Sequence, residues 1–250
     1  MFSIIVCSHR PERAAFIRNH YETLFRGFDH EIIAIDDARS LCEGYTRGFE
    51  RSRGDLLIFS HDDVEFIAPD VAARVREHLR HFDLIGIAGT TRLIDGMWLS
   101  AGDPHCFMLV LYPEPGGQYS VRFAGKGPLV VPNIQAVDGC FMACQREVVE
   151  TIGFDVETFD GFHLYDLDFS FRAHKIGFEV AVCRDIPLIH LSQGVPDEVW
   201  QKYRERFEAK HREALGGPAG TMQVVGTLGT KEDLARVCRP ENLLSAVRWA

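Results

Sequence analysis

Leu56-Leu57-Ile58-Phe59-Ser60-His61-Asp62-Asp63-Val64 is the segment of this 250-residue chain that most clearly indicates its fold. Its first four residues form a short apolar run, which predicts a buried strand. Two carboxylates directly after such a strand repel one another unless a cation lies between them. Because open α/β proteins bind ligands at the carboxyl ends of their strands, the stretch predicts an α/β fold with a divalent metal at this position. A turn or a helix cap is the alternative for Asp62 and Asp63.

Short apolar segments alternate with helical patterns around that stretch. Strands are expected at residues 2–7, 31–35, 56–59 and 83–89, with helical periodicity between successive strands. This order predicts a Rossmann-like, mostly parallel sheet with helices on both of its faces.

The pattern loosens after residue 90, where we expect a second, smaller β region. The expected elements are a hairpin of residues 106–112 and 118–124, strands at 128–137, 178–183 and 187–191, and helices at 146–152, 166–176 and 198–215. The segment Gly216-Gly217-Pro218-Ala219-Gly220 has the composition of a linker. It leads to a weakly patterned C-terminal tail, expected to be helical and either to pack back or to mediate contacts.

Composition is that of a globular protein without disulfides. Hydrophobic residues make up 46% and charged residues 25% of the chain, which are ordinary values. Seven scattered cysteines favour reduced thiols in a cytoplasmic protein, and a zinc site at Cys140 and Cys144 lacks a second ligand pair. The net charge of −9 argues against a nucleic-acid-binding surface. No transmembrane segment is expected, because no apolar stretch approaches the roughly 20 residues that span a bilayer, and the N-terminus lacks the features of a signal peptide.

Polar residues at the other strand ends are expected to line the same crevice. Ser8 and Arg10 follow the first strand, and Arg10 is a candidate contact for a diphosphate. Asp36 follows the second strand, where an acid commonly binds a ribose or a base; a helix cap is the alternative. His190 ends an apolar strand, either as a core residue or as a metal ligand. Without a glycine-rich phosphate loop, a Rossmann dehydrogenase and a P-loop NTPase are both disfavoured.

Asp166 is the candidate general base, because it begins the helix expected at residues 166–176. The helix dipole favours its ionised form, and an ionised carboxylate within reach of a hydroxyl can accept its proton. A plain N-cap is the alternative. Asp168 lies two residues on and is expected to face elsewhere.

Six segments in this order resemble the family-2-type glycosyltransferases of the GT-A fold, over about residues 2–191. They are residues 3–10, 31–37, 54–63, 138–143, 165–172 with 177–178, and 189–190. The resemblance implies that Asp36 contacts the nucleotide of a UDP-, GDP- or dTDP-sugar. It also implies that Asp62 and Asp63 form the DxD-type element, with Asp63 as the better ligand for Mn²⁺ or Mg²⁺ and Asp62 supporting the site or the ribose. Asp166 would be the catalytic base, and His190 would help to bind the metal.

Two positions depart from that family's pattern. Tyr165 stands where the family has an acid before the catalytic aspartate, and His61 stands where many relatives have an acid in the metal-binding element. The resemblance still implies a metal-dependent, inverting transfer of a sugar to a hydroxyl of a glycan, a lipid-linked sugar or a small molecule. The alternatives are a non-catalytic sugar- or nucleotide-binding domain and a sugar-phosphate nucleotidyltransferase. The latter requires a glycine-rich loop that Ser8-His9-Arg10-Pro11 does not supply.

We therefore expect a glycosyltransferase domain at residues 1–215. Within it, residues 1–91 would bind the nucleotide, residues 92–195 would bind the metal and the acceptor, and residues 196–215 would form a helix. Residues 216–250 would be the linker and the tail. The sequence leaves the oligomeric state open, a homodimer included.

Overall fold

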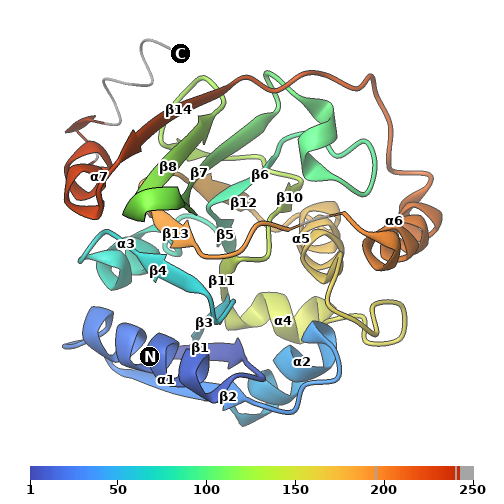
Figure 1. Cartoon of the computed structure of the whole chain (residues 1–250). Helices are drawn as coiled ribbons and strands as arrows, with labels where there is room; N and C mark the ends of the chain where they lie inside the picture. The colour runs from blue at the N-terminus through green and yellow to red at the C-terminus, as the bar shows by residue number, and fades with distance from the viewer. Residues whose placement is uncertain (195, 240, 243–250) are drawn as a thin grey trace.

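The computed structural model describes residues 1–194, 196–239 and 241–242, and these form two packed β-sheets with helices around them (Figure 1). In chain order the elements are β1 (Phe2–Cys7), α1 (Pro11–Leu24), β2 (His30–Ile35), α2 (Leu41–Arg51), β3 (Leu56–Ser60), β4 (Val64–Phe66), α3 (Val71–His78), β5 (Leu84–Gly86), β6 (Ala88–Thr90), η1 (Trp98–Ala101), β7 (Cys106–Glu114), η2 (Pro115–Gly117), β8 (Gln118–Ala124), β9 (Val130–Val131), β10 (Ala136–Val137), β11 (Phe141–Gln145), α4 (Arg146–Ile152), α5 (Tyr165–Lys175), β12 (Val180–Cys183), β13 (Leu188–His190), α6 (Glu198–His211), β14 (Val224–Gly229) and α7 (Lys231–Val237). The predicted α/β class is confirmed, but the sheets are mixed rather than mostly parallel.

The first sheet has the order β2-β1-β3-β11-β5-β12-β9. β1 lies between β2 and β3 and runs parallel to both, as expected, so that these three strands end side by side. Beyond β3 the sheet is mixed, because β11 runs antiparallel to both β3 and β5. The sequence pattern did not predict β11, a five-residue strand that is buried except at its last residue.

The second sheet has the order β10-β6-β7-β13-β4, with β8 on β7 and β14 on β8. The expected hairpin is present as β7 and β8. The strand expected at residues 83–89 divides into β5 and β6, which belong to different sheets. A side chain at Gly86 would approach the Val137 Cβ to 2.7 Å, so glycine lets the chain pass close to β10 where it changes sheets. The strand expected at residues 128–137 likewise divides into β9 and β10.

The C-terminal tail packs back onto the second sheet. In Figure 1 the chain leaves α6, crosses the molecule and adds β14 beside β8. α7 then places Leu234, which is 1% exposed, in a small apolar cluster with residues of β7, β8 and β13. The tail thus contains a strand as well as the expected helix.

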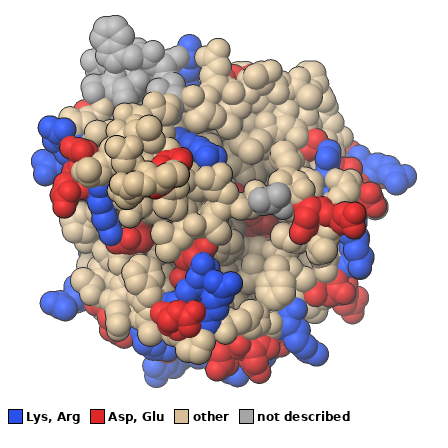
Figure 2. Space-filling view, viewed as in Figure 1, with Lys and Arg blue, Asp and Glu red and all other residues tan. Residues whose placement is uncertain are grey.

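All seven cysteines lie in the described part of the chain and are free. Among the described residues, no helix is long and apolar enough to cross a membrane. Acidic and basic side chains are interspersed over the face drawn in Figure 2.

Candidate functional site

The ends of β1 and β3 are joined by a direct side-chain contact. Ser8, which follows β1, donates from its Oγ to Asp62 Oδ2 at 2.5 Å. Asp36 follows β2 and is exposed, and its carbonyl oxygen lies 3.1 Å from His9 Nδ1. The expected crevice residues therefore end neighbouring strands, with Ser8 and Asp62 in contact.

Arg13 is the cation that faces the two acids. Pro11 starts α1, a position that suits proline because its missing N–H is not needed there. The first turn then directs Arg13 Nη1 to 3.6 Å from both Asp62 Oδ1 and Asp63 Oδ2. Arg10, the residue that the sequence analysis selected, is the exposed N-cap of this helix.

Three side chains gather their ligand atoms at the junction of the two sheets. His190 Nε2 lies 3.3 Å from Asp63 Oδ1, and His61 Nδ1 lies 3.4 Å from His190 Nε2 and 3.9 Å from Asp63 Oδ1. These three residues form a group that could hold a metal ion. Asp63 and His190 were expected there, whereas His61 had been noted only as a departure from the family pattern.

Backbone pairing fixes this geometry. His61 and Asp63 belong to the short connection between β3 and β4, and β13 pairs antiparallel with β4, so that His190 lies opposite Val64. The Leu191 N–H donates to the Asp63 carbonyl at 2.9 Å. Two residues that are far apart in the sequence are thereby brought to one point.

The charges of this group are coupled. Burial by itself would raise the pKa of Asp63, but the hydrogen bond and the charge of His190 outweigh it and hold that pKa well below its usual value. The pKa of His190 is raised, because Asp63 outweighs the opposite effect of burial. Burial and then the charge of His190 lower the pKa of His61. His61 therefore favours the neutral form, which is the form that binds metals.

Asp166 lies in the first turn of α5, and its carboxylate accepts a hydrogen bond from a neighbouring loop. Gly139 N donates to Asp166 Oδ2 at 2.6 Å. A Cβ at Gly139 would lie 2.7 Å from the Asp166 Cβ and would collide with the Tyr165 hydroxyl, so glycine is required for this approach. The N-cap is Leu164, in the left-handed conformation. Asp166 is therefore not the plain N-cap of the alternative interpretation.

The pKa of Asp166 is raised to about 7, first by burial and then by the charge of Asp138. Asp138 is itself held in place, since Oδ2 accepts from Trp98 Nε1 at 3.2 Å and Oδ1 accepts from Cys140 N at 3.0 Å. Asp138 was not predicted as a site residue, although it directly precedes Gly139, whose N–H donates to Asp166.

Asp168 faces away from the site, as expected. It is buried against Arg172, Lys210 and His211. Its role is therefore to join α5 to α6.

One cavity of about 480 Å³ is lined by Asp166, Asp138, His61 and His190. Aromatic and apolar side chains form much of its remaining wall, including Trp98, Tyr112, Trp200 and Met222.

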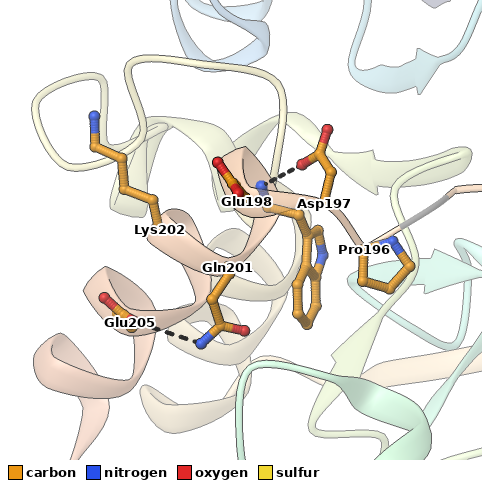
Figure 3. Close-up of a pocket in the computed structure, with 7 residues that line it drawn as sticks. Pro196, Asp197, Glu198, Gln201, Lys202 and Glu205 are labelled. Carbon is orange, nitrogen blue, oxygen red and sulfur yellow. Dashed lines mark hydrogen bonds between the residues drawn. The ribbon is translucent and has the colours of Figure 1, made fainter.

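A more open depression of about 610 Å³ surrounds the first turns of α6 (Figure 3). There Asp197 accepts from Trp200 N at 2.7 Å, and Gln201 Nε2 donates to Glu205 Oε1 at 3.3 Å. None of the predicted site residues lines this depression. The 480 Å³ cavity is therefore the candidate active site.

The chain was compared with families of known proteins, with curated proteins and with solved structures. Curated proteins give no match. Among solved structures, the mannosyltransferase PcManGT from Pyrobaculum calidifontis, in complex with GDP-Man and Mn²⁺, is 12% identical; the alignment covers 99% of this chain and 71% of that one, with a TM-score of 0.49. GalNAc-T7 with UDP, GalNAc and Mn²⁺ is also 12% identical, with coverages of 97% and 55% and a TM-score of 0.44. S. aureus TarS 1-349 is 14% identical, with coverages of 85% and 64% and a TM-score of 0.44.

Family membership is assigned from the match to a family model and not from these structural likenesses. The model of the family described as "Glycosyltransferase like family" matches residues 3–211, which include every residue of the site described above except Met222. The chain therefore belongs to this glycosyltransferase-like family, and the protein is a glycosyltransferase.

Proposed function

We propose that the protein transfers a sugar from a nucleotide-sugar donor to an acceptor hydroxyl with inversion at the anomeric carbon. The observation that carries this proposal is the shared cavity, which Asp166, with a pKa raised to about 7, lines together with His61 and His190 of the candidate metal-binding group. A base and an electrophilic site in one cavity are what displacement of a nucleoside diphosphate by a hydroxyl requires.

The donor would occupy the ends of β1, β2 and β3. Ser8, Arg10, Asp36 and Asp62 are the candidate nucleotide contacts, within a nucleotide-binding half at residues 1–91. Asp63 and His190 would hold Mn²⁺ or Mg²⁺, whose positive charge stabilises the departing diphosphate.

The acceptor would enter the cavity within the half formed by residues 92–195. Its hydroxyl would bind the Asp166 carboxylate, which takes the proton as the new C–O bond forms and the bond to the diphosphate breaks. Trp98 and Trp200 offer flat apolar surfaces for a sugar ring. The acceptor would be a glycan, a lipid-linked sugar or a small molecule.

The test begins with a thermal-shift panel of UDP-, GDP- and dTDP-sugars in the presence of Mn²⁺, followed by turnover assays with the donor that binds. We expect Asp166→Asn to lower turnover by at least about 100-fold, the lower range for loss of a general base. Asp37→Asn is the matched control, because Asp37 is an exposed acid that pairs with Arg47 outside the cavity. Unimpaired turnover in Asp166→Asn would remove this residue from the base role.

The same assays separate the two alternatives. A donor that binds without transfer or hydrolysis, across a panel of acceptors, would indicate a non-catalytic binding domain. Release of pyrophosphate from a nucleoside triphosphate and a sugar phosphate would indicate a nucleotidyltransferase.

A further inference from the structure

The two positions that depart from the family pattern contact each other in the structure. His61 Nε2 lies 2.9 Å from the Tyr165 hydroxyl, across 104 residues of sequence. The same hydroxyl donates to the Gly139 carbonyl at 3.0 Å. A chain of hydrogen bonds therefore runs from the loop before β11, through α5, to a member of the metal-binding group.

This chain selects the tautomer of His61. A phenol has one proton, and the Tyr165 proton is donated to the Gly139 carbonyl. The phenol oxygen can then only accept from His61, so Nε2 of that imidazole carries a hydrogen. Its Nδ1 keeps a free lone pair, and Nδ1 is the atom that faces Asp63 and His190.

The Tyr165 ring has little freedom to move. The residue is 3% exposed, and its ring packs edge-on against Tyr45 with the centroids 5.6 Å apart. Gly139 provides the space that the hydroxyl occupies, since a Cβ there would collide with it.

We propose that Tyr165 is a positioning residue that fixes His61 as a third metal ligand, so that the site binds a first-row transition metal in preference to Mg²⁺. Imidazole ligands favour first-row metals later in the series than Mn²⁺, Co²⁺ among them, whereas Mg²⁺ favours an oxygen shell and retains its waters. An orienting partner on the second nitrogen of a metal-bound histidine typically changes metal affinity by about 10–100-fold. This inference extends the proposed function, but its test uses the metal alone.

The experiment titrates metal-free, full-length protein with Co²⁺ and follows both heat and visible absorption. We expect one bound Co²⁺ that a large excess of Mg²⁺ does not displace. Tyr165→Phe should lower the affinity for Co²⁺ by about 10–100-fold, and His61→Ala by at least as much. Tyr203→Phe and His163→Ala are the matched controls. The Tyr203 hydroxyl bonds to Asp160, and the His163 ring packs against Tyr203 with the centroids 6.1 Å apart, so neither should change Co²⁺ affinity.

A second variant guards against loss of affinity through misfolding. His61→Asp replaces an imidazole with a carboxylate, so it should gain affinity for Mg²⁺ relative to Co²⁺, a gain that misfolding cannot produce. Unchanged Co²⁺ affinity in Tyr165→Phe, or an unchanged preference between the metals in His61→Asp, would overturn the inference.

Failure of this inference can be distinguished from failure of the proposed function. Co²⁺ binding with the expected variant pattern but no sugar transfer would leave the metal site standing without the transferase reaction. If the protein transfers sugar and the Tyr165→Phe variant keeps its Co²⁺ affinity, the proposed function stands and the role of Tyr165 is rejected.

Discussion

The effect of the Asp138 charge on the pKa of Asp166 can be tested with a pH–rate profile. Because burial and Asp138 raise the pKa of Asp166 to about 7, its base form is lost as the pH falls through that value. We therefore expect log(kcat/KM) to fall with a slope of about one below pH 7. Asp138→Asn removes a negative charge and should move this acid limb to lower pH, while Asp37→Asn should leave it in place. An acid limb that does not move in Asp138→Asn would contradict the electrostatic coupling.

Individual site residues could be predicted from the sequence where they end a strand. His190 ends β13, and Asp63 lies in the short connection just after β3; strand ends gather at the mouth of a sheet. The role of His61 could not be predicted in this way, because it depends on where Tyr165 places a hydroxyl 104 residues later. Arg13 was missed because the rotation of α1 about its axis decides whether Arg10 or Arg13 faces the acids.

At the scale of elements, the tail is part of the architecture around the site. β14 pairs with β8 along its whole length, and Met222 and Val224 line the cavity. Lys231 of α7 forms an ion pair with Glu65 of β4, which places this acid outside the metal group. A local sequence pattern cannot predict β14, because this strand depends on an available edge of β8. The short strands β4 and β11, three and five residues long, were not predicted either; only the first residues of β11 fall within a segment that resembles the family.

Leu234 and Leu228 provide a matched test of whether the tail stabilises the molecule. Leu234 is 1% exposed and packs in the cluster that includes Ile189, the neighbour of His190, whereas Leu228 is 62% exposed. Leu234→Ala should lower the free energy of unfolding of the tail and the strand it covers by about 2–5 kcal/mol. Leu228→Ala should change it by less than about 0.5 kcal/mol.

Hydrogen exchange of the β8 and β14 amides measures the stability of the tail in both variants. Equal protection in the two would show that the tail does not depend on its buried contact.

In the molecule as a whole, the three residues that could hold a metal ion lie where the two sheets meet. His61 follows β3 of the first sheet, Asp63 precedes β4 of the second, and His190 ends β13 of the second. The general order of strands and helices in residues 1–90 followed from hydrophobic periodicity, apart from the short β4 and the division of β5 from β6. The junction between the sheets could not be predicted from that periodicity, because the chain passes from one sheet to the other within residues 84–90 while remaining apolar.

A ligand that bridges this junction should stabilise both sheets together. A nucleoside diphosphate with Mn²⁺, at about 100 times its dissociation constant, adds about 2.7 kcal/mol to the free energy of unfolding. For a chain of this size that corresponds to a rise in Tm of roughly 5–10 °C. We expect UDP, GDP or dTDP with Mn²⁺ to produce one cooperative, shifted transition, and EDTA to reverse most of the shift. Asp63→Asn should abolish the metal-dependent part, because it removes the carboxylate charge between the two imidazoles, and Asp37→Asn should retain it. A shift of the same size in Asp63→Asn, or one that EDTA leaves intact, would show that the nucleotide binds without a metal at this junction.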